Sequence, residues 1–191
     1  MSHEVKPPKP SAPPGEAPPA DGPEAIQREL LQRALEGLAG GDMLSFMQLL
    51  PMERWHDGEW SVARIPLLPI FLNPMGILHG GVTAIFLDSL MGWSLAEQAG
   101  RPVVTVQLNV NYVKPGRGPW VVVRARPTHI GRFTGVAEGR VEDHEGQLIS
   151  QGTGTFFFTG DGDGTGQAGW TLVPGKSGHL PMSHELVPVP E

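Results

Sequence analysis

The residues with the clearest chemical potential lie in one short segment in the first half of the chain. His79 is followed there by Gly80 and Gly81, at the start of an apolar run of helical length. Glycine is a poor helix former, by about 1 kcal/mol relative to alanine. Its unobstructed backbone N–H groups at a helix start can instead bind an anion and let a ligand approach closely. The pattern indicates an anion-binding turn, unless the two glycines serve only to let helix and strand pack tightly.

A carboxylate stands inside the same run. Asp88 lies within the apolar stretch from Ile85 to Met91. Aspartate is among the weaker helix formers, and a carboxylate in apolar surroundings is costly unless it is paired or used. Asp88 is therefore a candidate catalytic group, with the alternative that it lies on an exposed stripe beside Ser89 and Thr83. His79, likewise, is either a site residue or an ordinary hydrogen-bonding group at the helix start.

The spacing of these groups predicts a site shared between two subunits. Asp88 comes nine residues after His79, which is about 13 Å further along a helix axis. Its carboxylate cannot serve an anion at the start of its own helix. It could serve the start of an antiparallel copy of that helix, and a two-fold dimer would then contain two such sites.

The elements around this segment predict an α+β domain. A helix is expected over residues 80–99, ending at Gly100, and a hairpin turning at Asp57-Gly58 is expected before it. Four strands are expected after it, over 103–113, 120–130, 132–143 and 147–158. Short links between successive strands imply antiparallel neighbours, so we expect a four-stranded meander. The long helix should lie against this curved antiparallel sheet.

Composition divides the chain into four parts. Residues 1–23 hold eight of the 20 prolines and predict a disordered, Pro-rich arm. Residues 24–42 predict an amphipathic helix that packs on the core or on a partner subunit. Residues 43–159 predict the folded domain, and residues 160–191 a Gly- and Pro-rich tail.

Charge and cysteine content exclude several classes of function. A formal net charge of −6 argues against a nucleic-acid or anionic-membrane surface. The absence of cysteine excludes disulfides, thiolate metal sites and cysteine nucleophiles. The apolar runs are too short to span a bilayer. We expect a soluble, cytoplasmic protein without a metal or cofactor.

Two stretches of sequence form a longer pattern. They are Asn73-x5-His79-Gly80-Gly81-x6-Asp88-x3-Gly92 and Thr105-x3-Asn109-x2-Tyr112-x2-Pro115. Together they resemble the hotdog-fold acyl-CoA thioesterases of the 4-hydroxybenzoyl-CoA thioesterase-like superfamily. The closest likeness is to the branch with the phenylacetate-pathway thioesterases and their animal relatives, and later segments extend it over residues 43–159. The resemblance implies a long central helix wrapped by a curved antiparallel sheet, and a homodimer or a dimer of dimers.

The resemblance also implies roles for five residues. Asp88 would be the general base that activates water, or the nucleophile. Gly81 would bind the thioester oxyanion through its backbone N–H. Asn73 would position the water or the carbonyl, and His79 would orient the loop or polarise the thioester. Thr105 would hydrogen-bond the carboxylate or the water, and would come with Asp88 from one subunit, the others coming from its partner.

Coenzyme A itself implies further contacts. Gly80 would lie against the substrate. Arg132, with Lys114 or Arg117, would pair with the phosphates of coenzyme A, with the alternative that these cations are ordinary surface residues.

The resulting prediction is an enzyme, an acyl-CoA thioester hydrolase that releases free acid and coenzyme A from an acyl- or aryl-acyl-CoA. The carboxylate is Asp, whereas branches acting on hydroxybenzoyl- or dihydroxynaphthoyl-CoA mostly have Glu, which weakly disfavours those substrates. One alternative is a non-catalytic acyl-CoA-binding or sensing module, which would not need Asp88. Others are a hotdog hydratase or dehydratase, whose residues are not found here, and a hydrolase of acyl carrier protein, which the acidic charge disfavours.

Overall fold

The computed structural model describes residues 22–40 and 50–159 of the chain. The elements in chain order are α1 (Pro23–Gly40), β1 (Glu53–Asp57), β2 (Trp60–Pro66), the 3-10 turn η2 (Pro69–Phe71), α2 (Gly80–Ala99), β3 (Val103–Tyr112), β4 (Trp120–Ile130), β5 (Thr134–Asp143) and β6 (Leu148–Phe158). The predicted arm, up to residue 21, and the predicted tail over 160–191 lie outside the described residues.

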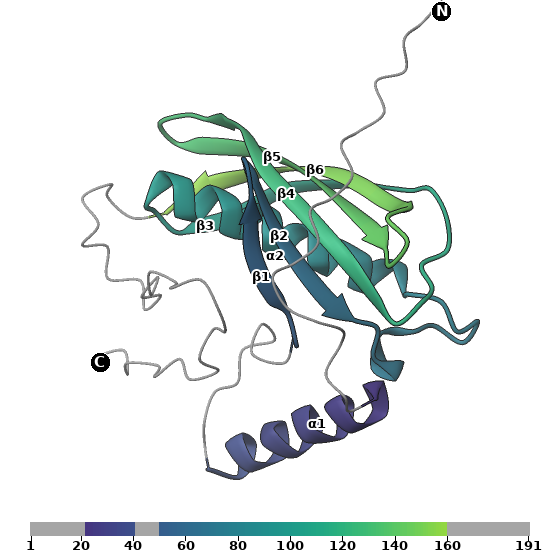
Figure 1. The fold of residues 1–191 in the computed structure, drawn as a ribbon. Coiled ribbons are helices and arrows are strands. Elements are labelled where there is room, and N and C mark those ends of the chain that lie inside the picture. The colour runs from purple at the N-terminus through teal and green to yellow at the C-terminus, as the bar shows by residue number, and fades with distance from the viewer. Residues whose placement is uncertain (1–21, 41–49, 160–191) are drawn as a thin grey trace, which may run out of the picture.

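The six strands form one antiparallel sheet that curves around α2 (Figure 1). Their order across the sheet is β1-β2-β4-β5-β6-β3, which leaves β1 and β3 at the two edges. This confirms the predicted α+β arrangement of a long helix wrapped by a curved sheet.

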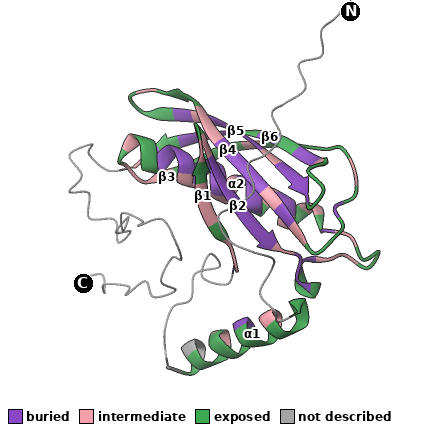
Figure 2. Cartoon of the chain, viewed as in Figure 1, coloured by how far each residue is buried: buried purple, intermediate pink, exposed green. Residues whose placement is uncertain are grey.

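The core lies between α2 and the concave face of the sheet (Figure 2). The helix buries one apolar face, which includes Phe86, Leu87, Leu90, Met91 and Leu95. The facing strand β5 leaves room for the helix at Gly139. A side chain at Gly139 would start 3.0 Å from a methyl group of Leu87, so this glycine lets α2 approach the sheet. The helix ends as predicted at Gly100, which has a left-handed conformation (φ 64°).

The predicted four-stranded meander is wrong in one respect, because β3 pairs with β6 and not with β4. Strand β4 lies between β2 and β5, so both of its edges are already paired. The loop between β3 and β4 contains Pro115 and Pro119, which have no N–H for a hairpin ladder. It crosses the end of the domain instead, where the carbonyl of Gly116 accepts from the N–H of Leu78 at 3.0 Å.

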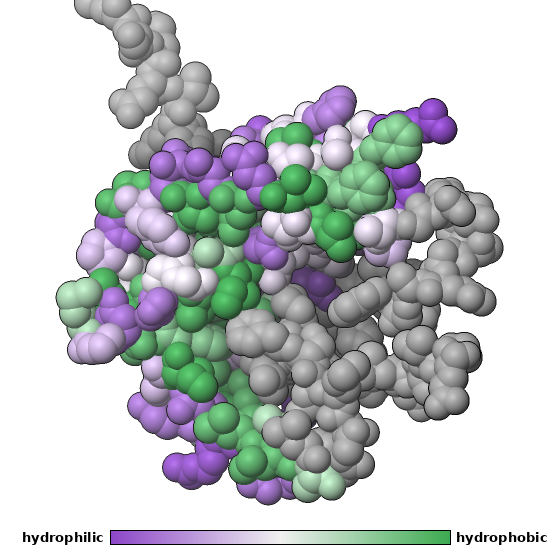
Figure 3. Space-filling model, turned by 180° about the vertical axis from the view of Figure 1, so that it is seen from behind, coloured by the Kyte–Doolittle hydropathy of each residue, from purple (hydrophilic) through white to green (hydrophobic). Residues whose placement is uncertain are grey.

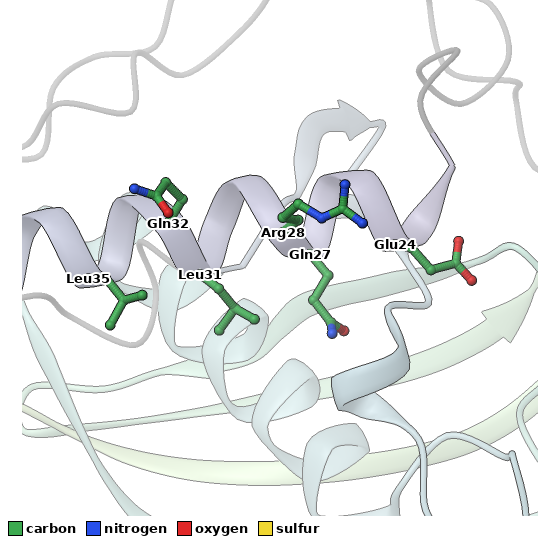
Figure 4. Close-up of a pocket in the computed structure, with 6 residues that line it drawn as sticks. All are labelled: Glu24, Gln27, Arg28, Leu31, Gln32 and Leu35. Carbon is green, nitrogen blue, oxygen red and sulfur yellow. The ribbon is translucent and has the colours of Figure 1, made fainter.

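Helix α1 packs on the core through η2, which is one of the two places expected for the first helix. Leu30 is buried in the core cluster, and the side-chain oxygen of Gln27 accepts the Ile70 N–H at 2.7 Å. A pocket along α1 is lined by Glu24, Gln27, Arg28, Leu31, Gln32 and Leu35 (Figure 4).

Candidate functional site

The first turn of α2 is capped by the residue before it. His79 has an extended backbone, and its Nδ1 accepts the Gly81 N–H at 3.0 Å. Its carbonyl accepts the backbone N–H of Thr83 at 3.0 Å and the hydroxyl of Thr83 at 3.2 Å. A neutral imidazole that accepts at Nδ1 has its proton on Nε2, so this bond assigns the tautomer. The predicted helix start at Gly80 is confirmed.

This cap uses the Gly81 N–H, which the family resemblance implies as the donor to the thioester oxyanion. Gly81 is exposed, and a side chain added there would start 3.2 Å from Nδ1 of His79. An oxyanion can take the Gly81 N–H once the imidazole moves aside, because a single N–H makes one strong hydrogen bond at a time. The described arrangement is therefore that of a self-capped turn.

Asn73 shapes the loop that leads into this turn. Its side-chain oxygen accepts the N–H of Met75 at 2.9 Å and of Ile77 at 3.3 Å. The loop then returns to the core, where the His79 N–H donates to the carbonyl of Phe71 at 2.9 Å. These bonds use only the side-chain oxygen of Asn73, so its amide nitrogen is the group that could position water or a carbonyl.

Asp88 lies two turns further along α2, beside strand β3. The Thr105 hydroxyl donates to Oδ1 of Asp88 at 2.8 Å, so the structure brings together the two residues expected from one subunit. Asp88 is half-buried and Thr105 is exposed. The pairing of β3 with β6 is irregular between Thr105 and Gln107, and such bulges re-aim side chains next to sites.

The two groups of residues do not meet within one chain. Asp88 and Gly81 are seven residues apart on the same helix, or about 10 Å along its axis. A single chain thus presents two separate groups of candidate residues, which we call the candidate half-sites. One is the turn with Asn73, His79 and Gly81, and the other is the Asp88–Thr105 pair.

Two of the three cations proposed for coenzyme A, Arg132 and Lys114, differ in their surroundings. The guanidinium of Arg132, in the β4–β5 turn, lies 5.0 Å from the ring centre of Phe133, and Arg132 is exposed. The ammonium of Lys114 lies 2.6 Å from Oδ2 of Asp143, so a phosphate would have to compete with this ion pair.

The carboxylate of Asp143 is held in its ionised form. Burial by itself raises the pKa of Asp143, but hydrogen bonds from Lys114 and from the N–H groups of Gln147 and Glu145 outweigh burial. The net pKa lies below the ordinary value for Asp. The pair joins the loop after β3 to the β5–β6 turn, so we attribute a structural role to it.

Asp143→Asn is expected to lower the free energy of unfolding at pH 7, and the loss should shrink on acidification. Because the folded-state pKa is depressed below the unfolded value of about 3.9, the carboxylate stabilises the fold above that pH. This contribution is lost as pH falls through the folded-state pKa. Urea unfolding of both proteins at neutral pH and near pH 3 measures it. A deficit of the same size at both pH values, or an equal deficit in the neighbouring control Glu145→Gln, would contradict this account.

A second cluster of aromatic and charged side chains joins strand β1 to α2. The His56 ring stacks on Trp93 with centroids 5.5 Å apart, and its Nε2 lies 3.3 Å from Glu97. The guanidinium of Arg54 lies 4.4 Å from the Trp93 ring centre. Burial lowers the pKa of Arg54, and the charge of Glu97 opposes that shift. These contacts hold the β1 edge against the helix.

One contact at the site was not expected from the sequence. The pattern includes Tyr112 without giving it a role, but its hydroxyl donates to the carbonyl of Gly80 at 2.7 Å.

Over residues 22–40 and 50–159, no group of three or more His, Asp or Glu side chains could hold a metal ion. None of the helices in these two segments is long and apolar enough to cross a membrane.

Comparison with known proteins identifies the family. The model of the thioesterase superfamily matches residues 75–150. A predicted esterase of Halobacterium salinarum is 32% identical over 127 residues, which cover 60% of this chain and 82% of that protein. The 1,4-dihydroxy-2-naphthoyl-CoA hydrolase of Escherichia coli is 26% identical over 118 residues, 60% of this chain and 85% of that enzyme. A Bacillus halodurans protein solved with CoA superposes with a TM-score of 0.59 at 31% identity, covering 70% of this chain and 93% of that one. The chain therefore belongs to the thioesterase superfamily and has its hotdog fold.

Proposed function

We propose that this protein hydrolyses the thioester of an acyl- or aryl-acyl-CoA to the free acid and coenzyme A, in sites shared between two copies of the chain. The observation that carries the proposal is the Thr105–Asp88 hydrogen bond beside β3, which is an edge of the sheet among residues 22–40 and 50–159. The E. coli relative is named as a CoA thioester hydrolase, and the B. halodurans protein was solved with CoA. Both support a CoA ester as the substrate class.

The half-site with Asp88 would provide the attack on the thioester carbon, either by the carboxylate itself or by a water that it activates. The bond from Thr105 fixes one carboxylate oxygen and leaves the other to react. As a base, Asp88 would take a proton from the attacking water; as a nucleophile, it would form an anhydride that water then hydrolyses. Either route expels the coenzyme A thiolate, which is then protonated. Both routes give the same products, the free acid and coenzyme A.

The half-site at the start of α2 would stabilise the charge that develops on the carbonyl oxygen. The Gly81 N–H is the donor, once His79 has released it. Such a donor is typically worth about 3 kcal/mol in the transition state. Asn73 and the Nε2–H of His79 would position the water or the carbonyl.

The edge strand β3 supports a two-fold dimer that joins the half-sites. All ten of its residues, from Val103 to Tyr112, are uncharged, and Val104 and Val106 are 51% and 63% exposed. Proteins usually protect a free edge with charges or proline. The opposite edge, β1, has Glu53, Arg54 and Asp57 in five residues. Antiparallel pairing of β3 with a second β3 would bury this edge and bring Asp88 towards the partner's α2.

The molecule also has apolar surface that a second copy could cover. Strands β1, β2 and β4 pass over one side of α2 (Figure 1), and apolar surface lies on the opposite side of the molecule, between polar patches (Figure 3). Arg132 and Arg117, both exposed, remain the candidates for the phosphates of coenzyme A, because Lys114 is paired with Asp143.

Thiol release from a panel of aliphatic and aromatic acyl-CoAs tests the function. The chain has no cysteine, so a thiol reagent detects only released coenzyme A. We expect at least one ester to be hydrolysed with kcat/KM above about 10⁴ M⁻¹s⁻¹. Parallel assays of Asp88→Asn control for a contaminating hydrolase. Binding of CoA esters without turnover would instead identify a carrier or sensor of acyl-CoA.

A further inference from the structure

We propose that Tyr112 is a positioning residue that aims the Gly81 N–H at the thioester oxygen. The inference rests on the proposed hydrolysis, because it concerns the same oxyanion donor. It assigns a task to a side chain on the edge strand β3 that contacts neither the reacting atoms nor Asp88.

The contact between Tyr112 and the start of α2 has a polar and a van der Waals part. The hydroxyl donates to the Gly80 carbonyl at 2.7 Å. The ring edge lies against the same residue, since a side chain at Gly80 would start 3.4 Å from Cε1 and Cζ. Even a Cβ at Gly80 would only reach van der Waals contact with the ring, so the ring lies directly against the helix start.

The bonded carbonyl and the oxyanion donor belong to one peptide group. The carbonyl of Gly80 and the N–H of Gly81 are joined by one peptide bond, which is planar. Fixing the direction of the carbonyl therefore fixes the direction of the N–H on its other side. A donor on the carbonyl also polarises the amide, which strengthens the N–H as a donor.

Tyr112 can keep this bond during the reaction, whereas His79 cannot keep its own. The cap from His79 uses the Gly81 N–H itself and must yield when an oxyanion binds there. The bond from Tyr112 uses the other end of the peptide group. Two successive glycines give this turn no side chains of its own, so the bond from Tyr112 adds a restraint to those that the backbone of α2 supplies.

The same strand also holds the other half-site. Thr105 of β3 fixes Asp88, and Tyr112, at the far end of β3, fixes the peptide of Gly81. Asp88 and the peptide of Gly81 are thus both positioned by β3, the edge strand at which a second copy would pair. In the shared site, the distance between Asp88 and the partner's donor would depend on both contacts.

The test is Tyr112→Phe in the full-length protein, which keeps the ring and removes only the hydroxyl. Tyr112 is 55% exposed, so no core cavity results. We expect kcat for the best CoA ester to fall about tenfold. KM, thermal midpoint and oligomeric state should stay as in the wild type. Hydrogen exchange should accelerate in the first turn of α2 and not in its C-terminal half.

Ser94→Ala is the matched control. The Ser94 hydroxyl also donates to a backbone carbonyl of α2, that of Met91 at 2.8 Å, but the bond is internal to the helix. This variant should keep kcat within about twofold.

The possible results separate the two proposals. If Asp88→Asn loses turnover while Tyr112→Phe keeps kcat within twofold, hydrolysis stands and the role of Tyr112 is overturned. A fall in kcat that comes with a lower thermal midpoint or with dissociation also overturns it, in favour of a purely structural contact. A wild-type protein that releases no thiol from any ester overturns both proposals.

Discussion

Asp88→Asn should lower kcat by at least about 10²-fold, or roughly 2.7 kcal/mol, with little change in KM. Asparagine has nearly the same shape and can still accept from the Thr105 hydroxyl, so the fold and the site geometry should persist. It can neither take a proton from water at neutral pH nor attack the thioester as a carboxylate. The loss should therefore appear in the chemical step. Thiol release at saturating ester measures it.

Glu97→Gln provides the matched control for that substitution. It neutralises another carboxylate of α2, one that contacts His56 and not Thr105. Its kcat should stay within about twofold of the wild type. If Asp88→Asn retained a similar rate, Asp88 would be a structural partner of Thr105, and water would have to be activated by another group.

The elements of the fold could be predicted from the sequence where local chemistry determines them. Helix α2 begins at Gly80 and ends before Gly100 because an apolar run of helical length lies between two glycine signals. The hairpin turn at Asp57-Gly58 follows from a dipeptide that favours tight turns. In each case the determining residues are neighbours in the chain.

The strand order could not be predicted, because it depends on contacts between residues far apart in the chain. A short link between β3 and β4 favours a hairpin, but two prolines and the contact of Gly116 with Leu78 direct the loop across the domain. Strand β3 then pairs with β6, about forty residues later in the chain, and becomes an edge.

The candidate site was predictable in residue types but not in their contacts. The bulge after Thr105 shifts the alternation of β3 by one residue, so that Leu108 and Val110 pack on the core while Asn109 and Asn111 are exposed. Strict alternation from Thr105 would have placed Tyr112 on the opposite face of the strand. Alternation counted from Leu108 and Val110 places Tyr112 on their face instead, so the strand pattern alone does not determine the bond from Tyr112 to the start of α2.

Heterodimers of Asp88→Asn and His79→Ala should regain activity that neither variant has alone. Each variant is expected to lose one half-site, and His79→Ala should reduce kcat at least about tenfold by removing a group that orients the oxyanion turn. If each site combines Asp88 of one chain with the turn of its partner, a heterodimer has one site with both substitutions and one with neither. Heterodimers isolated with two affinity tags should then show about half of the wild-type activity per dimer, because a two-fold dimer has two equivalent sites.

A pair of substitutions in the same half-site provides the control for this experiment. Asp88 and Thr105 contact each other within one chain, so a heterodimer of Asp88→Asn with Thr105→Val contains no intact site. It should show no gain over the Thr105→Val homodimer. Recovery in the first heterodimer but not in the second requires that the half-sites meet across an interface between chains. If the first heterodimer formed and stayed as inactive as its parents, the half-sites would have to act within one chain. The unpaired edge of β3 would then need another explanation.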